Sequence, residues 1–157
     1  MITRQLFLVL LLFPATLWGK GFFEYPQVDL DSAEAVQLTS NQHELYAVLF
    51  FEPNCSWCFK QTQVFNQYLR NCSNAVEVFG LGVNGSRQEL KAESWRLRAR
   101  FPLYMASSEL VADLGKIDAT PLTILFDGQG DVVTYAKGYL PYKKWLTFVA
   151  QNIEGRC

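Results

Sequence analysis

Two cysteines separated by two residues, Cys55 and Cys58 in the run Cys-Ser-Trp-Cys, are the residues of this chain best suited to chemistry. They follow a continuous apolar run, residues 45–51, and precede a stretch in which apolar residues recur at helical spacing. Cys55 is therefore expected to open a helix, where the dipole and free N–H groups stabilise a thiolate. We expect Cys55 to be the nucleophile of thiol–disulfide exchange and Cys58 to resolve the mixed disulfide.

Other roles of a Cys-x-x-Cys pair are less compatible with this sequence. Haem attachment requires a histidine after the second cysteine, and position 59 is phenylalanine. A structural zinc site usually takes four ligands from two close pairs, whereas Cys72 and Cys157 each stand alone. A purely structural disulfide would close a very small ring. We therefore expect redox exchange, with no metal ion and no cofactor.

The first residues have the pattern of a secretory signal. Arg4 precedes an apolar run, residues 6–13, that is followed by a proline and by small residues. The run is shorter than the stretch of about 20 apolar residues that a bilayer span requires. We expect residues 1–21 to be a signal peptide whose removal leaves no membrane span, and an uncleaved anchor is the alternative. Export places all four cysteines in a compartment where disulfides persist.

The charge and composition exclude some classes of partner. The 157 residues carry a formal net charge of −1, with acidic and basic side chains interspersed. Such a chain has no electrostatic footprint for nucleic acid or for an anionic membrane surface. Half of the residues are hydrophobic, which is enough to bury the core of one domain. The arginines at positions 87, 96, 98 and 100 are interpreted as a solvated face.

The rest of the sequence alternates between predicted strands and helices. A lead-in at residues 22–25 is expected to be extended, and the polar stretch 31–42 is compatible with a helix. Parallel βαβ units followed by a hairpin and a closing helix define an α/β sandwich. The predicted strands are residues 45–51, 76–83, 101–105, 122–126 and 132–135, and the predicted helices are residues 55–72, 86–99, 107–114 and 141–153.

This order of features resembles the thioredoxin-like superfamily. The shared features are a buried strand, Cys-x-x-Cys at a helix start, a βα unit, and Thr120-Pro121 before a β-hairpin. The resemblance implies an α/β, thioredoxin-like fold with a central mixed β-sheet flanked by helices. It also implies that Pro121 is cis and faces the dithiol, and that Thr120 helps to hold the backbone of a substrate. The expected organisation is a signal peptide at 1–21, an N-terminal extension at 22–44 and a thioredoxin-like domain at 45–157.

Within the superfamily, the export signal, residues 101–118 and the Asp-Gly-Gln-Gly turn are similar to the bacterial periplasmic branches. These branches include TlpA-like reductases and the thioredoxin-like disulfide isomerases or assembly proteins of conjugative transfer systems. The resemblance implies cysteine-containing protein substrates and a membrane or periplasmic redox partner. We expect a periplasmic thiol–disulfide oxidoreductase that reduces or isomerises protein disulfides. The alternative is an assembly factor or chaperone of an envelope or conjugative-transfer complex, with a secondary redox role.

Two positions depart from thioredoxin itself. Leu49 lies six residues before Cys55, where thioredoxin has a buried aspartate that helps to move the proton of the resolving cysteine. Glu52 is the nearest acid, either a partial substitute or a solvated loop carboxylate. Ser56 and Trp57 replace the Gly-Pro of thioredoxin, and Trp57 is expected to shield the thiols or to contact substrate, with simple surface packing as the alternative. These departures leave the direction of the redox reaction open.

Cys72 and Cys157 are candidates for a structural disulfide. In a thioredoxin-like topology the helix that ends at Cys72 and the closing helix lie on the same face of the sheet. In the chain-entropy model such a disulfide stabilises the fold by about 4 kcal/mol. A free, frayed Cys157 and an intermolecular bridge are the alternatives.

Overall fold

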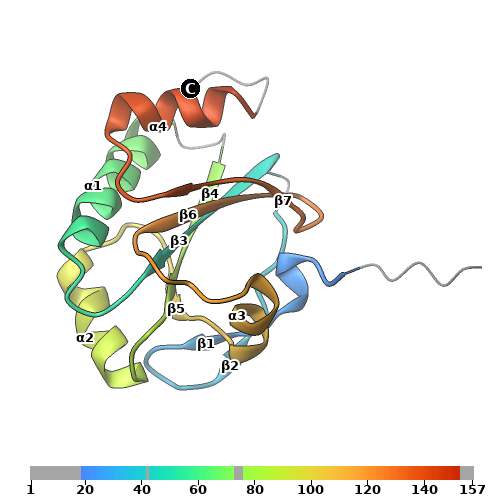
Figure 1. Ribbon diagram of the computed structural model, residues 1–157, viewed down its shortest axis with the longest axis vertical. Helices are drawn as coiled ribbons and strands as arrows, with labels where there is room; N and C mark the ends of the chain where they lie inside the picture. The colour runs from blue at the N-terminus through green and yellow to red at the C-terminus, as the bar shows by residue number, and fades with distance from the viewer. Residues whose placement is uncertain (1–18, 42, 73–75, 153–157) are drawn as a thin grey trace, which may run out of the picture.

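Figure 1 shows the computed structural model of the protein, which describes residues 19–41, 43–72 and 76–152. Within these ranges a seven-stranded mixed sheet has the order β2-β1-β5-β4-β3-β6-β7. Its strands are β1 (Gln27–Asp29), β2 (Ala35–Val36), β3 (Leu45–Phe51), β4 (Val76–Gly82), β5 (Leu103–Met105), β6 (Leu122–Asp127) and β7 (Val132–Lys137). The helices are the 3-10 helix η1 (Phe22–Glu24), α1 (Ser56–Asn71), α2 (Arg87–Leu97), α3 (Ser108–Leu114) and α4 (Tyr142–Ala150).

The central strand β3 is buried along its whole length, as its continuous apolar sequence predicts. It pairs in parallel with β4 and antiparallel with β6. Because side chains alternate along a strand, Ala47 and Leu49 face the layer of α1 and α4, while Val48 and Phe50 face the layer of η1 and α3. The predicted mixed sheet with helices on both faces is confirmed.

Helices α2 and α4 begin where the sequence predicts them. Ser86 and Glu89 form the expected capping box of α2, because Ser86 accepts a hydrogen bond from the N–H of Glu89 and the Glu89 carboxylate accepts one from the N–H of Ser86. Helix α4 follows Pro141 directly. Helices α1 and α4 lie on the same face of the sheet, where Phe65 packs on Trp145 with ring centroids 4.6 Å apart.

The segment before β3 is part of the same sheet. Strand β1 pairs antiparallel with β5 and also with β2. Phe22 is buried and stacks on Phe126 of β6, with ring centroids 4.5 Å apart. Its N–H donates a hydrogen bond to the carbonyl of Gly130, where φ is +87° and an added Cβ would lie 2.5 Å from the Phe22 nitrogen. Only glycine fits this contact between η1 and the β6–β7 turn.

The helical interpretation of residues 31–42 is wrong. The Asp29 carboxylate accepts hydrogen bonds from the N–H groups of Asp31 and Ser32, which form a turn. Ala33 then adopts a left-handed φ of 63°, and the chain returns as β2. Side chains that bond to their own backbone compete with helix formation, and here the turn prevails.

Two predictions fall partly outside the described residues. Residues 1–18 of the predicted signal peptide and Cys157 are not described, so the signal and the Cys72–Cys157 disulfide stay predictions. Cys72 itself is buried at the end of α1, in the apolar layer that includes Trp145 of α4. None of the helices within residues 19–152 that the structure describes is long and apolar enough to cross a membrane.

Candidate active site at Cys55 and Cys58

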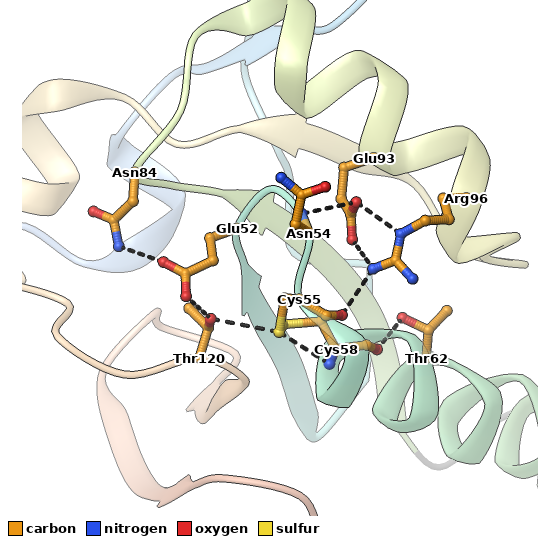
Figure 2. The surroundings of a disulfide bond; sticks show 9 residues. All are labelled: Glu52, Asn54, Cys55, Cys58, Thr62, Asn84, Glu93, Arg96 and Thr120. Atoms are coloured by element: carbon orange, nitrogen blue, oxygen red, sulfur yellow. Dashed lines mark hydrogen bonds and ion pairs between the residues drawn. A yellow bond between two sulfur atoms is a disulfide. The ribbon is translucent and has the colours of Figure 1, made fainter.

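The site is built around a disulfide between Cys55 and Cys58, whose sulfur atoms are 2.04 Å apart at the start of α1 (Figure 2). Cys55 caps the helix, because its Sγ accepts a hydrogen bond of 3.1 Å from the N–H of Cys58. Cys58 is fully buried in an apolar cluster with Leu90 and Leu97 of α2, whereas Cys55 is partly exposed. An incoming thiol or disulfide therefore meets Cys55 first, at the helix end that stabilises negative charge.

The loop before β6 brings Thr120 to this disulfide, although it lies more than sixty residues further along the chain. The Thr120–Pro121 peptide bond is cis, which confirms the expectation from the resemblance. Thr120 Oγ1 lies 3.6 Å from Cys55 Sγ, and Pro121 is buried. The hydroxyl group of Thr120 is thus the polar group that this loop presents to the first sulfur.

Glu52 belongs to the site rather than to a freely solvated loop. It follows the last residue of β3 and is partly buried. Its Oε1 accepts a hydrogen bond of 2.7 Å from Thr120 Oγ1, and its Oε2 accepts one of 3.0 Å from Asn84 Nδ2. The position expected to hold the proton-transferring acid of thioredoxin is occupied by Leu49, which is fully buried among apolar side chains.

Two side chains of α2, Glu93 and Arg96, bond to the backbone of Asn54 and Cys55, the redox loop that leads into α1. Glu93 is buried and accepts hydrogen bonds from the N–H of Asn54 and from Arg96 Nε. Arg96 Nη2 donates to the carbonyl of Cys55 at 2.8 Å. The hydrogen bond with Glu93 raises the pKa of the Arg96 guanidinium. Asn54, whose N–H makes the first of these contacts, has a left-handed φ of 62°.

The interpretation of the four arginines as a solvated face is therefore wrong for two of them. Arg96 bonds to Glu93 and to the Cys55 carbonyl, and Arg87 donates to the carbonyl of Leu30 at 2.7 Å. The spacing of Glu93 and Arg96, i and i+3 on a predicted helix, is the sequence signal for their ion pair. Nothing in the sequence indicates their contacts with the redox loop.

Replacing Arg96 by methionine is expected to lower the free energy of unfolding by about 1–3 kcal/mol, because the buried Glu93 carboxylate loses its charged partner. Arg100→Met is the matched control, since Arg100 is exposed just beyond α2, and is expected to change stability by no more than about 0.5 kcal/mol. Urea unfolding of both variants measures the difference. Equal values for the two variants would refute the stabilising role of the contacts of Arg96.

Aromatic side chains stand on the first turn of α1, next to the cysteine pair in the sequence. Trp57 is 53% exposed and packs against Tyr139, with ring centroids 5.6 Å apart. Lys60 Nζ lies 4.0 Å from the centroid of the Trp57 ring. On the α2 side, a shallow hollow is lined by Phe59, Trp95, Arg96 and Arg98.

The described part of the chain offers no obvious metal centre. No group of three or more histidine, cysteine, aspartate or glutamate side chains in the described residues is placed to hold a metal ion. The chemistry that the arrangement supports is that of the two sulfur atoms themselves, with Thr120, Glu52 and the start of α1 as the polar groups around Cys55.

No known protein family and no curated protein matches the sequence. Solved structures do match it. A thiol:disulfide interchange protein from Bacteroides sp. gives a TM-score of 0.61 at 20% identity, over 83% of this chain and 86% of that chain. The exposed lipoprotein thioredoxin of Streptococcus pneumoniae gives 0.66 at 14% identity, over 81% and 98%. A secreted Mycobacterium tuberculosis disulfide oxidoreductase, homologous to E. coli DsbE, gives 0.64 at 12% identity, over 82% and 96%.

These similarities, with the strand order around β3 and the cysteine pair at the start of α1, define a protein of thioredoxin-like fold. More particularly, the chain resembles thiol:disulfide interchange proteins and DsbE- and DsbF-like proteins, some of them secreted or exposed. The likeness establishes the fold alone.

Proposed function

We propose that the protein is an exported thiol–disulfide oxidoreductase that reduces or isomerises the disulfides of proteins in the bacterial periplasm. The observation that carries the proposal is the Cys55–Cys58 disulfide, with an accessible first sulfur, a buried second sulfur and Thr120 beside the first. The predicted signal at residues 1–21 and the secreted structural neighbours support export. A membrane or periplasmic redox partner would maintain the dithiol.

In the reduced protein, the Cys55 thiolate attacks one sulfur of a substrate disulfide. A bond forms between Cys55 and that sulfur, and the other substrate sulfur leaves as a thiolate that takes a proton from solvent. The N–H of Cys58 and the dipole of α1 stabilise the attacking thiolate. Thr120 lies beside the Cys55 sulfur (Figure 2), and it is a proposed substrate-binding residue together with Pro121, which follows it, and the exposed Trp57 between the two cysteines.

The mixed disulfide is resolved in one of two ways. In a reductase, the Cys58 thiol gives its proton to solvent and attacks Cys55 Sγ, which restores the Cys55–Cys58 disulfide and releases the second substrate thiolate. Two electrons pass from the dithiol to the substrate, and a thiol partner must then reduce the pair again. In an isomerase, another substrate cysteine resolves the mixed disulfide and the dithiol returns unchanged.

Cys58→Ser tests the proposal by removing the resolving thiol. We expect this variant to accumulate a covalent complex with periplasmic proteins or with a disulfide-containing reporter peptide, because Cys55 still attacks and the bond is no longer resolved. Non-reducing electrophoresis detects the complex, and peptide mass spectrometry locates the bond.

Cys55→Ser is the matched control and is expected to form no such complex, because Cys58 is fully buried. A complex linked through Cys72 or Cys157, or an equal yield from both variants, would overturn the assignment of Cys55 as nucleophile.

A further inference from the structure

The hydroxyl hydrogen of Thr120 has two possible acceptors in the site, Glu52 and Cys55 (Figure 2). Thr120 Oγ1 lies 2.7 Å from Glu52 Oε1 and 3.6 Å from Cys55 Sγ. A hydroxyl group has a single hydrogen, so Thr120 donates fully to only one of them at a time. An ionised carboxylate is a much stronger acceptor than a disulfide sulfur. In the oxidised protein the hydrogen therefore points to Glu52.

Asn84 holds the Glu52 carboxylate in this position. Its Nδ2 donates to Glu52 Oε2 at 3.0 Å and to the carbonyl of Ile117 at 3.1 Å. Glu52 is partly buried and bonded from two sides, so its carboxylate cannot turn away without losing both hydrogen bonds. The Glu52 carboxylate, which competes with Cys55 Sγ for the Thr120 hydrogen, is therefore held in place by its neighbours.

Reduction changes what the Cys55 sulfur requires. A thiolate carries a negative charge and is stabilised by each hydrogen bond that it accepts. The N–H of Cys58 is already placed to donate, at 3.1 Å, but the Thr120 hydrogen is held by Glu52. The negative charge of Glu52 also opposes a thiolate beside it, because like charges disfavour ionisation. Both effects favour the disulfide over the reduced dithiol.

Three other charged groups of this region are already engaged, in ion pairs or over an aromatic ring. They are Arg96 with Glu93 on α2, Lys60 over the ring of Trp57 on α1, and Asp118 with Lys137 near the Thr120 loop. Among the described residues, Glu52 forms no ion pair. Its negative charge is thus not neutralised by a neighbouring cation.

We propose that Glu52 is a positioning residue that keeps the Cys55–Cys58 couple reducing, by holding the hydroxyl hydrogen of Thr120 away from the Cys55 thiolate. This inference rests on the proposed redox function and adds a direction to it. The pair gives electrons to substrate disulfides more readily than it takes them, as a reductase or isomerase requires.

Glu52→Gln tests the inference with little change of shape. Because Asn84 donates to one terminal atom of this side chain, the introduced glutamine places its oxygen there and turns its NH₂ group toward Thr120 Oγ1. The Thr120 hydrogen is then free to reach Cys55. In glutathione buffers, we expect the equilibrium constant for reduction of the Cys55–Cys58 disulfide to rise roughly tenfold, about 30 mV for a two-electron couple. The pKa of Cys55, measured by thiolate absorbance, is expected to fall.

Thr120→Val distinguishes an effect of the Thr120 hydrogen bond from an effect of the Glu52 charge alone. In a protein that already carries Thr120→Val, most of the tenfold gain from Glu52→Gln is expected to disappear. Asp118→Asn is the matched control, because it removes a nearby exposed carboxylate that has no bond to Thr120 or Glu52. It is expected to leave the equilibrium constant within about twofold, since solvent and salt screen such a charge.

The outcomes separate this inference from the proposed function. An unchanged constant in Glu52→Gln, or an equal gain with and without Thr120→Val, would overturn the role of Glu52 while the wild-type pair still exchanges with glutathione. Failure of the wild-type Cys55–Cys58 pair to equilibrate with glutathione or dithiothreitol would overturn the redox function itself, and that result needs no variant.

Discussion

A chain shortened to begin at Leu45 is expected to remain unfolded, because residues 22–44 supply part of the sheet and of the core. Phe22, Tyr25 and Leu38 are buried in the apolar layer that covers one face of β3. At about 1.5–3 kcal/mol for each buried apolar side chain, their loss removes about 5–9 kcal/mol. A domain of this size is stable by only about 5–15 kcal/mol. Far-UV circular dichroism and urea unfolding of the shortened chain measure the effect.

A single substitution tests the same point in the full chain. Phe22→Ala is expected to lower the free energy of unfolding by about 3–5 kcal/mol, whereas Trp95→Ala, at a side chain that is 72% exposed, is expected to change it by no more than about 0.5 kcal/mol. If the chain beginning at Leu45 unfolds cooperatively with undiminished stability, the segment before it is an extension that the domain does not need.

Cys55→Ala is expected to slow thiol–disulfide exchange by about three orders of magnitude. It removes the cysteine of the pair that is partly exposed and leaves Cys58, which is buried. The rate is measured with a peptide whose disulfide separates a fluorophore from its quencher. Cys58→Ala is the control, since it keeps the nucleophile and should react once with the reporter without turning over. A rate in Cys55→Ala within tenfold of the wild type would contradict the proposed mechanism.

The same variant distinguishes the enzyme from an assembly factor of an envelope or conjugative-transfer complex. Trp57 on α1 and Trp95 on α2 are exposed, and such side chains also suit a surface that binds a partner without redox chemistry. If Cys55→Ala fully restores a strain that lacks the protein, binding is the function and the dithiol is secondary. If it does not, disulfide exchange is required.

The parts of the fold that the sequence predicts well are those with a strong local pattern. Strand β3 is a continuous apolar run, and α2 has a capping box and an ion pair that each join residues three apart. Strands β1 and β2 have three and two residues, too few for a periodic pattern, and they form because β5 pairs with β1. The stretch that contains β2 is therefore compatible by sequence with a helix, which the Asp29 turn prevents.

The candidate site divides in the same way. The local spacing of Cys55 and Cys58 predicts a redox pair at a helix start, and the resemblance to thioredoxin-like proteins adds Pro121. The contacts of Glu52 with Thr120, and of Arg96 with Cys55, join residues 68 and 41 positions apart. Such contacts depend on how strands and helices pack, and no property of the residue types specifies them.

The hydrogen bonds between α2 and the loop of Asn54 and Cys55 imply that the Cys-Ser-Trp-Cys run does not carry its own geometry into another protein. Grafted onto another thioredoxin-like scaffold, the four residues would keep their chemistry but leave behind the Glu93–Arg96 pair that holds their backbone. Exchange of this motif between relatives would therefore transfer the nucleophile without its geometry. Protein engineers who wish to move the activity should move α2 together with the motif.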